Sequence, residues 1–131
     1  MGLFLTVLLF LSACERYDPK RDYRWEIPFP SESMVPVIQQ TIDDDSTVQW
    51  WTHPSEIIRA YLNRTPYADD AIGIDIKILS RNVVSATAEM ILKDDSLRLV
   101  FELSSAYPQK GEKSLMQIVQ VKAEKWSNPS R

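Results

Sequence analysis

The stretch from Ala71 to Ser104, AIGIDIKILSRNVVSATAEMILKDDSLRLVFELS, decides the fold of this chain. Apolar residues alternate with polar ones in three runs, and short polar connections separate the runs. A period of two places the apolar side chains of a β-strand on one face of it. The pattern therefore predicts three antiparallel strands joined by tight turns, with one dry face.

The three runs are told apart by the connections between them. Ser80 to Asn82 and Asp94 to Ser96 are made of residue types that favour turns. The apolar positions of the runs are Ile72, Ile74, Ile76 and Ile78; Val84, Ala86, Ala88, Met90 and Leu92; and Leu97, Leu99, Phe101 and Leu103.

A fourth strand is predicted from Leu115 to Trp126, after a longer loop that contains a proline and a glycine. Its first apolar side carries Val119, Val121 and Ala123. Met116 and Ile118 fall on the opposite side, which we expect to be covered by the N-terminal segment or by a partner. Met116 and Ile118 are therefore candidate contacts with a partner.

A helix is predicted before the sheet, from Pro54 to about Asn63. Thr52 or His53 can cap it, and Pro54 suits its first turn. Its apolar positions form one narrow stripe: Ile57, Ile58, Tyr61 and Leu62. Residues 33–42 have apolar residues at helical spacing and Pro36 near their start, so we favour a second helix there, with a strand as the alternative.

The apolar face of the sheet must be buried, and only the two helical stripes can cover it. The sequence therefore predicts a single α+β domain over residues 31–126, with one or two helices packed on an antiparallel sheet of about four strands. Residues 127–131 form a loose tail. The order of elements is similar to that of small cystatin-like and nuclear-transport-factor-2-like folds, a likeness that implies a ligand pocket between helix and sheet.

The N-terminus begins with an apolar run from Leu3 to Leu11, too short to span a membrane, which takes about 20 apolar residues. Small residues and the only cysteine of the chain follow it, in the order Leu11-Ser12-Ala13-Cys14. This order resembles the lipobox of bacterial lipoproteins. The resemblance covers residues 1–14, and it departs from the family in having no Lys or Arg before Arg16, which leaves open whether Met1 is the true start.

The resemblance implies a cleaved signal peptide over residues 1–13. Leu11, Ser12 and Ala13 would be recognised by the signal peptidase, and Cys14 would carry diacylglycerol and be acylated. Several acyl chains on one residue give stable anchoring. By the same resemblance, Glu15 at the next position permits sorting to the outer membrane, with the domain facing the periplasm.

Residues 14–30 are predicted to be the lipidated cysteine and an extended tether, because they mix charges, prolines and aromatic residues without periodicity. A flexible coil of this length reaches about 20 Å. Aromatic residues are unusual in free linkers. We therefore expect them to rest on the domain, with the lipid headgroups as the alternative.

Composition excludes some functions. The 131 residues have a net charge of −3, and no dense basic stripe of the kind that nucleic-acid binders carry occurs. No second cysteine is present to form a disulfide. No phosphate loop, zinc spacing or nucleophile motif occurs, and His53 is the only histidine. We therefore expect no enzyme activity, no metal and no cofactor.

Trp50 and Trp51 form the most conspicuous pair outside the strands. In an extended segment adjacent side chains point to opposite sides, so if one of them enters the core the other lies at a surface or at the mouth of a cavity. We favour the interpretation that both pack under the helix and the loops, with an aromatic anchor for a peptide or lipid partner as the alternative.

These observations favour a membrane-anchored envelope lipoprotein with a non-catalytic domain that binds another envelope protein, as an accessory of a transport, secretion or conjugation assembly. The alternative is a lipoprotein of cystatin-like or nuclear-transport-factor-2-like fold that binds a small ligand. An envelope hydrolase that uses Asp and Ser residues is the remote alternative, because no spacing supports it.

Overall fold

The computed structural model describes residues 20, 22–45 and 48–127. In chain order the elements are η1 (Glu32–Met34), α2 (Val35–Asp44), η2 (Gln49–Thr52), α3 (Pro54–Leu62), β1 (Lys77–Arg81), β2 (Ser85–Leu92), η3 (Lys93–Asp95), β3 (Leu97–Ser105), η4 (Pro108–Lys113) and β4 (Met116–Lys125), where η denotes a 3-10 helix.

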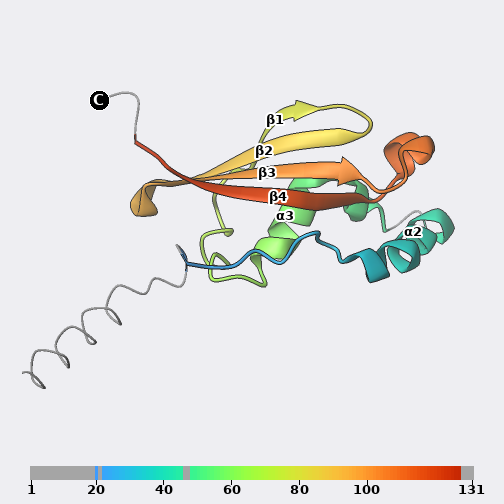
Figure 1. Cartoon of the computed structure of the whole chain (residues 1–131), viewed down its shortest axis with the longest axis horizontal. Coiled ribbons are helices and arrows are strands. Elements are labelled where there is room, and N and C mark those ends of the chain that lie inside the picture. Colours follow the sequence, from blue (N-terminus) through green and yellow to red (C-terminus); the bar gives the residue numbers. More distant parts are fainter. Residues whose placement is uncertain (1–19, 21, 46–47, 128–131) are drawn as a thin grey trace, which may run out of the picture.

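The four strands form one antiparallel sheet in the order β1-β2-β3-β4. Helix α3 and the segment that precedes η1 lie against one face of the sheet, and α2 lies toward one end (Figure 1). The sequence-based prediction of an α+β domain, with helices packed on an antiparallel sheet of four strands, is confirmed.

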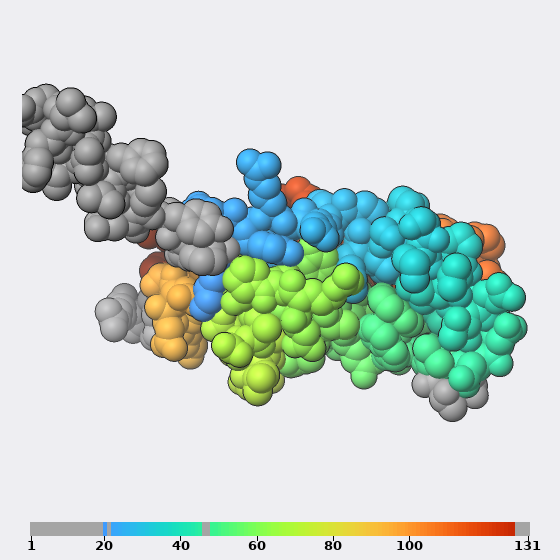
Figure 2. Space-filling model, turned by 90° about the horizontal axis from the view of Figure 1, so that it is seen from below, coloured from blue at the N-terminus to red at the C-terminus, as the bar shows by residue number. Residues whose placement is uncertain are grey.

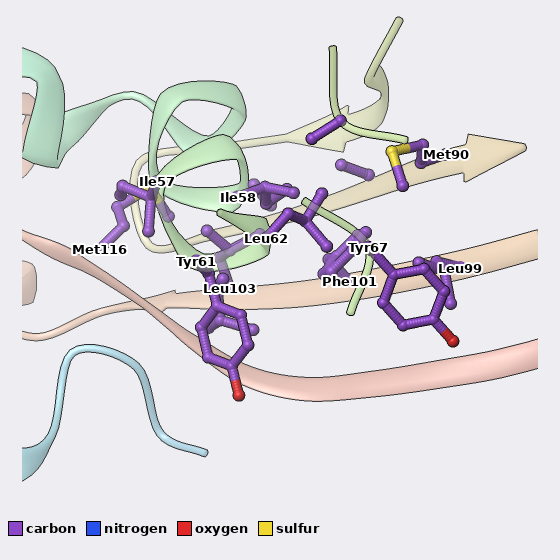
Figure 3. Packing of buried hydrophobic residues seen from close by; sticks show 14 of the residues in the cluster. Ile57, Ile58, Tyr61, Leu62, Tyr67, Met90, Leu99, Phe101, Leu103 and Met116 are labelled. Atoms are coloured by element: carbon purple, nitrogen blue, oxygen red, sulfur yellow. The ribbon is translucent and has the colours of Figure 1, made fainter. Parts of the chain in front are cut away.

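The core lies between α3 and the covered face of the sheet, as the two periodicities predict. Strands β2 and β3 bury every second residue, and α3 packs its apolar stripe on the face that these residues form. Figure 3 shows side chains of α3 meeting those of the sheet and of Tyr67. The residues of this layer with no exposed surface include Ile57, Ile58, Leu62, Met90, Leu99 and Phe101.

The prediction of a strand beginning at Ile72 is wrong, because β1 begins at Lys77. The Arg59 guanidinium donates hydrogen bonds to the carbonyls of Ala71, at 2.7 Å, and Ile74, at 3.0 Å. Gly73 between them has a φ of 87°, which glycine adopts without steric penalty. A side chain of α3 thus binds the carbonyls of a turn where alternation predicted a strand.

Strand β4 also departs from simple alternation. Val121 pairs with Phe101 and Ile118 pairs with Leu103, so β4 has one extra residue between these pairs. Such a bulge turns the following side chains to the other face of the sheet. Ile118 therefore lies in the core with no exposed surface, while Val119 is 41% exposed.

Residues 35–44 are helical, so the helix favoured for residues 33–42 is confirmed and the strand alternative is excluded. Pro36 lies in the first turn of α2. This helix packs through Val35, Ile38 and Ile42 against Leu115, in a smaller apolar cluster at the end of the sheet.

The segment of residues 22–30, predicted to be part of an extended tether, is packed on the domain. Phe29 forms a two-way backbone bridge with Ile118, with N–O distances of 3.0 and 2.7 Å. Its aromatic residues Tyr23, Trp25 and Phe29 contact the core cluster. The expectation that the aromatic residues of this segment rest on the domain is confirmed for these three residues.

Candidate partner-binding groove

A groove opens between the N-terminal segment and the helices. It is lined by residues 25–32 and Met34 of the N-terminal part and by Trp50, Trp51, Ala60 and Arg64, and its volume is about 940 Å³. Residues 22–45 and α3 share the face of the molecule drawn in Figure 2. We call this hollow the aromatic groove, because Trp25, Phe29, Trp50 and Trp51 line it.

Trp50 and Trp51 lie side by side in the aromatic groove. Their ring centroids are 4.0 Å apart with an interplanar angle of 26°, and both residues belong to η2. The extended backbone considered for this pair, which would point the two rings in opposite directions, is not found. Neither side chain is fully buried. Trp51 packs against both apolar clusters, whereas Trp50 belongs to neither.

The floor of the groove is a connected set of aromatic rings. Phe29 meets the edge of Tyr61 at 4.6 Å and lies 5.8 Å from Trp51, measured between ring centroids. Trp25 stacks on Tyr67 at 5.4 Å, with an interplanar angle of 10°. Offset and edge-on pairs of this kind each contribute about 1 kcal/mol beyond their buried area. The rings therefore hold the N-terminal segment in place and give the groove a rigid wall.

Polar groups at the groove make contacts within the domain. The Tyr61 hydroxyl donates a hydrogen bond to the Glu26 carbonyl at 2.8 Å, and burial of the ring raises the pKa of Tyr61. The Arg64 guanidinium lies 5.5 Å from the centre of the Phe29 ring, a cation–π distance. Apolar side chains at the groove and next to it remain open to solvent, namely Ile27, Met34 and Val37.

The uncovered face of the sheet has a different character. Arg98 bonds Glu89 at 2.6 Å and Glu124 at 3.0 Å across three strands. The hydrogen bond that Arg98 donates to Glu89 is the main cause of a raised pKa of Arg98. Ion pairs across strands suit a solvated face. The aromatic groove is therefore better suited than this face to receive an apolar partner.

Met116 and Ile118, the other two candidate partner contacts, lie inside the domain. Met116 is 4% exposed and Ile118 is 0% exposed, and both belong to the main core cluster. The prediction that they lie on the opposite side from Val121 is wrong, because the bulge in β4 brings both sets to one face. Phe29 of the N-terminal segment pairs with Ile118 through the backbone.

Candidate catalytic and metal-binding side chains do not come together in residues 20, 22–45 and 48–127. No group of three or more His, Cys, Asp or Glu residues in these ranges could hold a metal ion. His53 precedes α3 at the N-cap position, is exposed and makes no capping hydrogen bond through its side chain. A helix long and apolar enough to span a bilayer is not found in the same ranges.

The sequence-predicted anchor residues Leu11, Ser12, Ala13, Cys14 and Glu15 lie outside the residues that the structure describes. Sequence reasoning found Trp50 and Trp51 of the groove but missed the contribution of residues 25–32 and Met34 to its wall. The aromatic residues in that supposed linker were the available signal, since free linkers are poor in them.

Comparisons with protein-family models, curated proteins and solved structures found no match for this chain.

Proposed function

We propose that this protein is a lipid-anchored accessory protein of the bacterial cell envelope that binds another envelope protein through its aromatic groove. The observation that carries the proposal is a rigid, aromatic-lined groove beside exposed apolar side chains. Exposed apolar hollows of this kind are typical of binding sites, and Trp and Tyr are over-represented among the residues that dominate binding energy.

The anchor rests on the lipobox resemblance of Leu11 to Cys14. Lipidated Cys14 would hold the protein at the membrane, and Glu15 favours the outer membrane. Replacement of Cys14 by Ser is expected to abolish labelling by radioactive palmitate and to release the protein from membranes. Continued labelling of that variant would refute the anchor and leave the groove untouched.

The packed N-terminal segment sets how far the domain can stand from this anchor. Lys20 bonds Asp70 at 2.8 Å and Asp95 at 3.2 Å, and its carbonyl accepts a hydrogen bond from the Tyr67 hydroxyl at 2.6 Å. The hydrogen bond with Asp70 is the main cause of a raised pKa of Lys20. A chain from Cys14 to Lys20 spans at most about 20 Å. The proposal therefore implies a domain held close to the bilayer, where its partner must also be reachable.

A partner suited to the groove presents apolar side chains to the tryptophans. The alternative of a small ligand between helix and sheet has less support, because that space is filled by residues such as Ile58 and Phe101, which have no exposed surface. An accessory role in a transport, secretion or conjugation assembly is consistent with a partner in the envelope.

The experiment is photo-crosslinking in intact cells, with a benzoylphenylalanine placed at Met34 beside the groove or at Lys122 on β4 as a control. Both side chains are exposed. We expect one discrete adduct with an envelope protein from Met34 and none from Lys122. The same adduct from both positions, or no adduct from Met34, would contradict the proposal.

A matched pair of substitutions tests the groove itself. Trp50→Ala is expected to abolish the Met34 adduct while the melting temperature changes little, because Trp50 packs on neither core cluster. Trp51→Ala is expected to lower stability by about 2 kcal/mol or more, since Trp51 contacts both. An adduct that survives Trp50→Ala in a folded protein would remove Trp50 from the proposed contact.

A further inference from the structure

A second hollow lies at the end of the sheet away from Lys20. It has a volume of about 750 Å³ and forms where η2, η4 and the turn between β1 and β2 converge. Figure 1 shows that turn and η4 at the same end of the sheet, with the N-terminal segment beginning at the other end. We call it the distal hollow.

Hydrogen-bond donors from two separate segments line the distal hollow. Arg81 donates one hydrogen bond, to the Thr52 carbonyl at 3.2 Å, and no other partner of its guanidinium is found among the described residues. The Asn82 Oδ1 accepts bonds from the amides of Val84 and Ser85, which leaves the Asn82 NH₂ group as a donor. The Lys113 side chain forms no ion pair with any described residue.

Nearby acceptors are largely engaged already. The Ser114 hydroxyl accepts a bond from the Tyr107 amide and donates one to the Leu115 carbonyl. Asp43, in the neighbouring hollow, binds Lys110 at 3.1 Å and Gln39 at 3.0 Å. Exposed Glu112 is the one carboxylate in the lining, against the cations Arg81 and Lys113. The distal hollow therefore has surplus positive charge and unused donors.

We propose that the distal hollow binds the carboxylates of an acidic peptide segment of a partner protein. The Arg81 guanidinium uses one of its donors on the Thr52 carbonyl and keeps others for bidentate binding of a carboxylate, and Lys113 adds a second positive charge. The volume suits a ligand larger than a simple ion. Val83 and Met116 give the hollow apolar lining that a peptide can use and that phosphate cannot.

The net charge of the whole chain supports this location. A chain of net charge −3 repels an acidic segment over most of its surface, so a local excess of positive charge directs such a segment to one site. The inference goes beyond the proposed function, because it depends neither on lipidation of Cys14 nor on the aromatic groove.

The test is a titration of the full chain in detergent micelles, followed by amide chemical shifts in nuclear magnetic resonance. The probes are acetylated triglutamate, acetylated triglutamine as a neutral peptide of equal length, and inorganic phosphate. We expect saturable shifts with triglutamate at the amides of Arg81, Asn82 and Lys113. We expect neither triglutamine nor phosphate to produce these shifts at the same concentration.

Variants locate the site. Arg81→Gln and Lys113→Gln are each expected to weaken triglutamate binding about tenfold. If loss of the Thr52 contact disturbs the fold of the Arg81 variant, Lys113→Gln still tests the site. Lys122→Gln removes an exposed charge elsewhere and is expected to leave the affinity unchanged.

Three results would overturn the proposal. The first is weakening by Lys122→Gln equal to that by Lys113→Gln, which would mean non-specific attraction. The second is triglutamine binding as tightly as triglutamate. The third is phosphate competing with triglutamate at equal affinity, which would identify the hollow as a site for simple anions.

Discussion

Gln39 is a buried polar residue that joins α2 to the loop before β4. The residue is 3% exposed. Its Oε1 accepts a hydrogen bond from the Leu115 amide at 2.7 Å, and its Nε2 donates to the Lys113 carbonyl at 2.9 Å and to Asp43 at 3.0 Å. Replacement by Met keeps the length and shape of the side chain but removes all three bonds.

The expected loss of stability follows from the hydrogen-bonding groups that would lose Gln39 as their partner. Leu115 has no exposed surface, so its amide would be buried without a partner, at a cost of about 1–3 kcal/mol. The Lys113 carbonyl and Asp43 belong to exposed residues and can turn to water. The apolar methionine offsets part of the loss. We expect a net destabilisation of about 2 kcal/mol, or roughly 10 °C in melting temperature for a domain of this size.

The assay is guanidinium unfolding followed by tryptophan fluorescence, with amide hydrogen exchange at Leu115 as a local readout. Gln40→Met is the matched control, because Gln40 is the exposed neighbour on the same helix. We expect the control to change the free energy of unfolding by less than about 0.5 kcal/mol. Equal effects of the two variants, or unchanged exchange at Leu115 in the Gln39 variant, would refute this account of how α2 is attached.

Three further predictions follow from burial, titration and backbone geometry. Ile118→Ala should lower the free energy of unfolding, measured by chemical unfolding, by about 2–4 kcal/mol. Val119→Ala should change it by less than about 1 kcal/mol. A larger effect of Val119→Ala than of Ile118→Ala would show that the bulge in β4 is absent. Because the folded-state pKa of Tyr61 is raised, the contribution of its neutral form to stability is present below pH 10 and is lost as the pH rises above it. Alkaline unfolding should therefore be shallower for Tyr61→Phe than for wild type, and identical curves would show that Tyr61 does not contribute. Gly111 has a φ of 61° and a ψ of −131°. Gly111→Ala should therefore destabilise the protein by about 1–3 kcal/mol, measured by thermal unfolding. An unchanged melting temperature would show that this backbone conformation is not required.

The strands and the helix that were predicted correctly have patterns that depend on neighbours in sequence. Ala86 to Leu92 and Leu99 to Leu103 alternate because one face of the sheet is dry, and a period of two requires no knowledge of what covers it. Pro54 and the apolar stripe of α3 mark a helix in the same local way. These signals were enough for the α+β class.

The errors occurred where a distant residue decides the local structure. Ile72 continues an alternating pattern, but Arg59 of α3 binds the carbonyls around it and β1 begins later. An extended backbone would place Trp50 and Trp51 on opposite sides, but the 3-10 helix η2 stacks their rings. The aromatic groove could be predicted only in part, because its wall includes a segment whose sequence resembles a linker.

The sequence by itself determined the sheet, helix α3 and the expectation of a lipid anchor at Cys14, because hydrophobic periodicity and short motifs are properties of consecutive residues. Only the tertiary structure decided that the N-terminal segment docks through Phe29 on Ile118, that β4 changes register at its bulge, and that Arg81 and Lys113 meet at one hollow. Each of these depends on contacts between residues far apart in the chain. Such contacts stabilise the protein only once the core has brought the residues together.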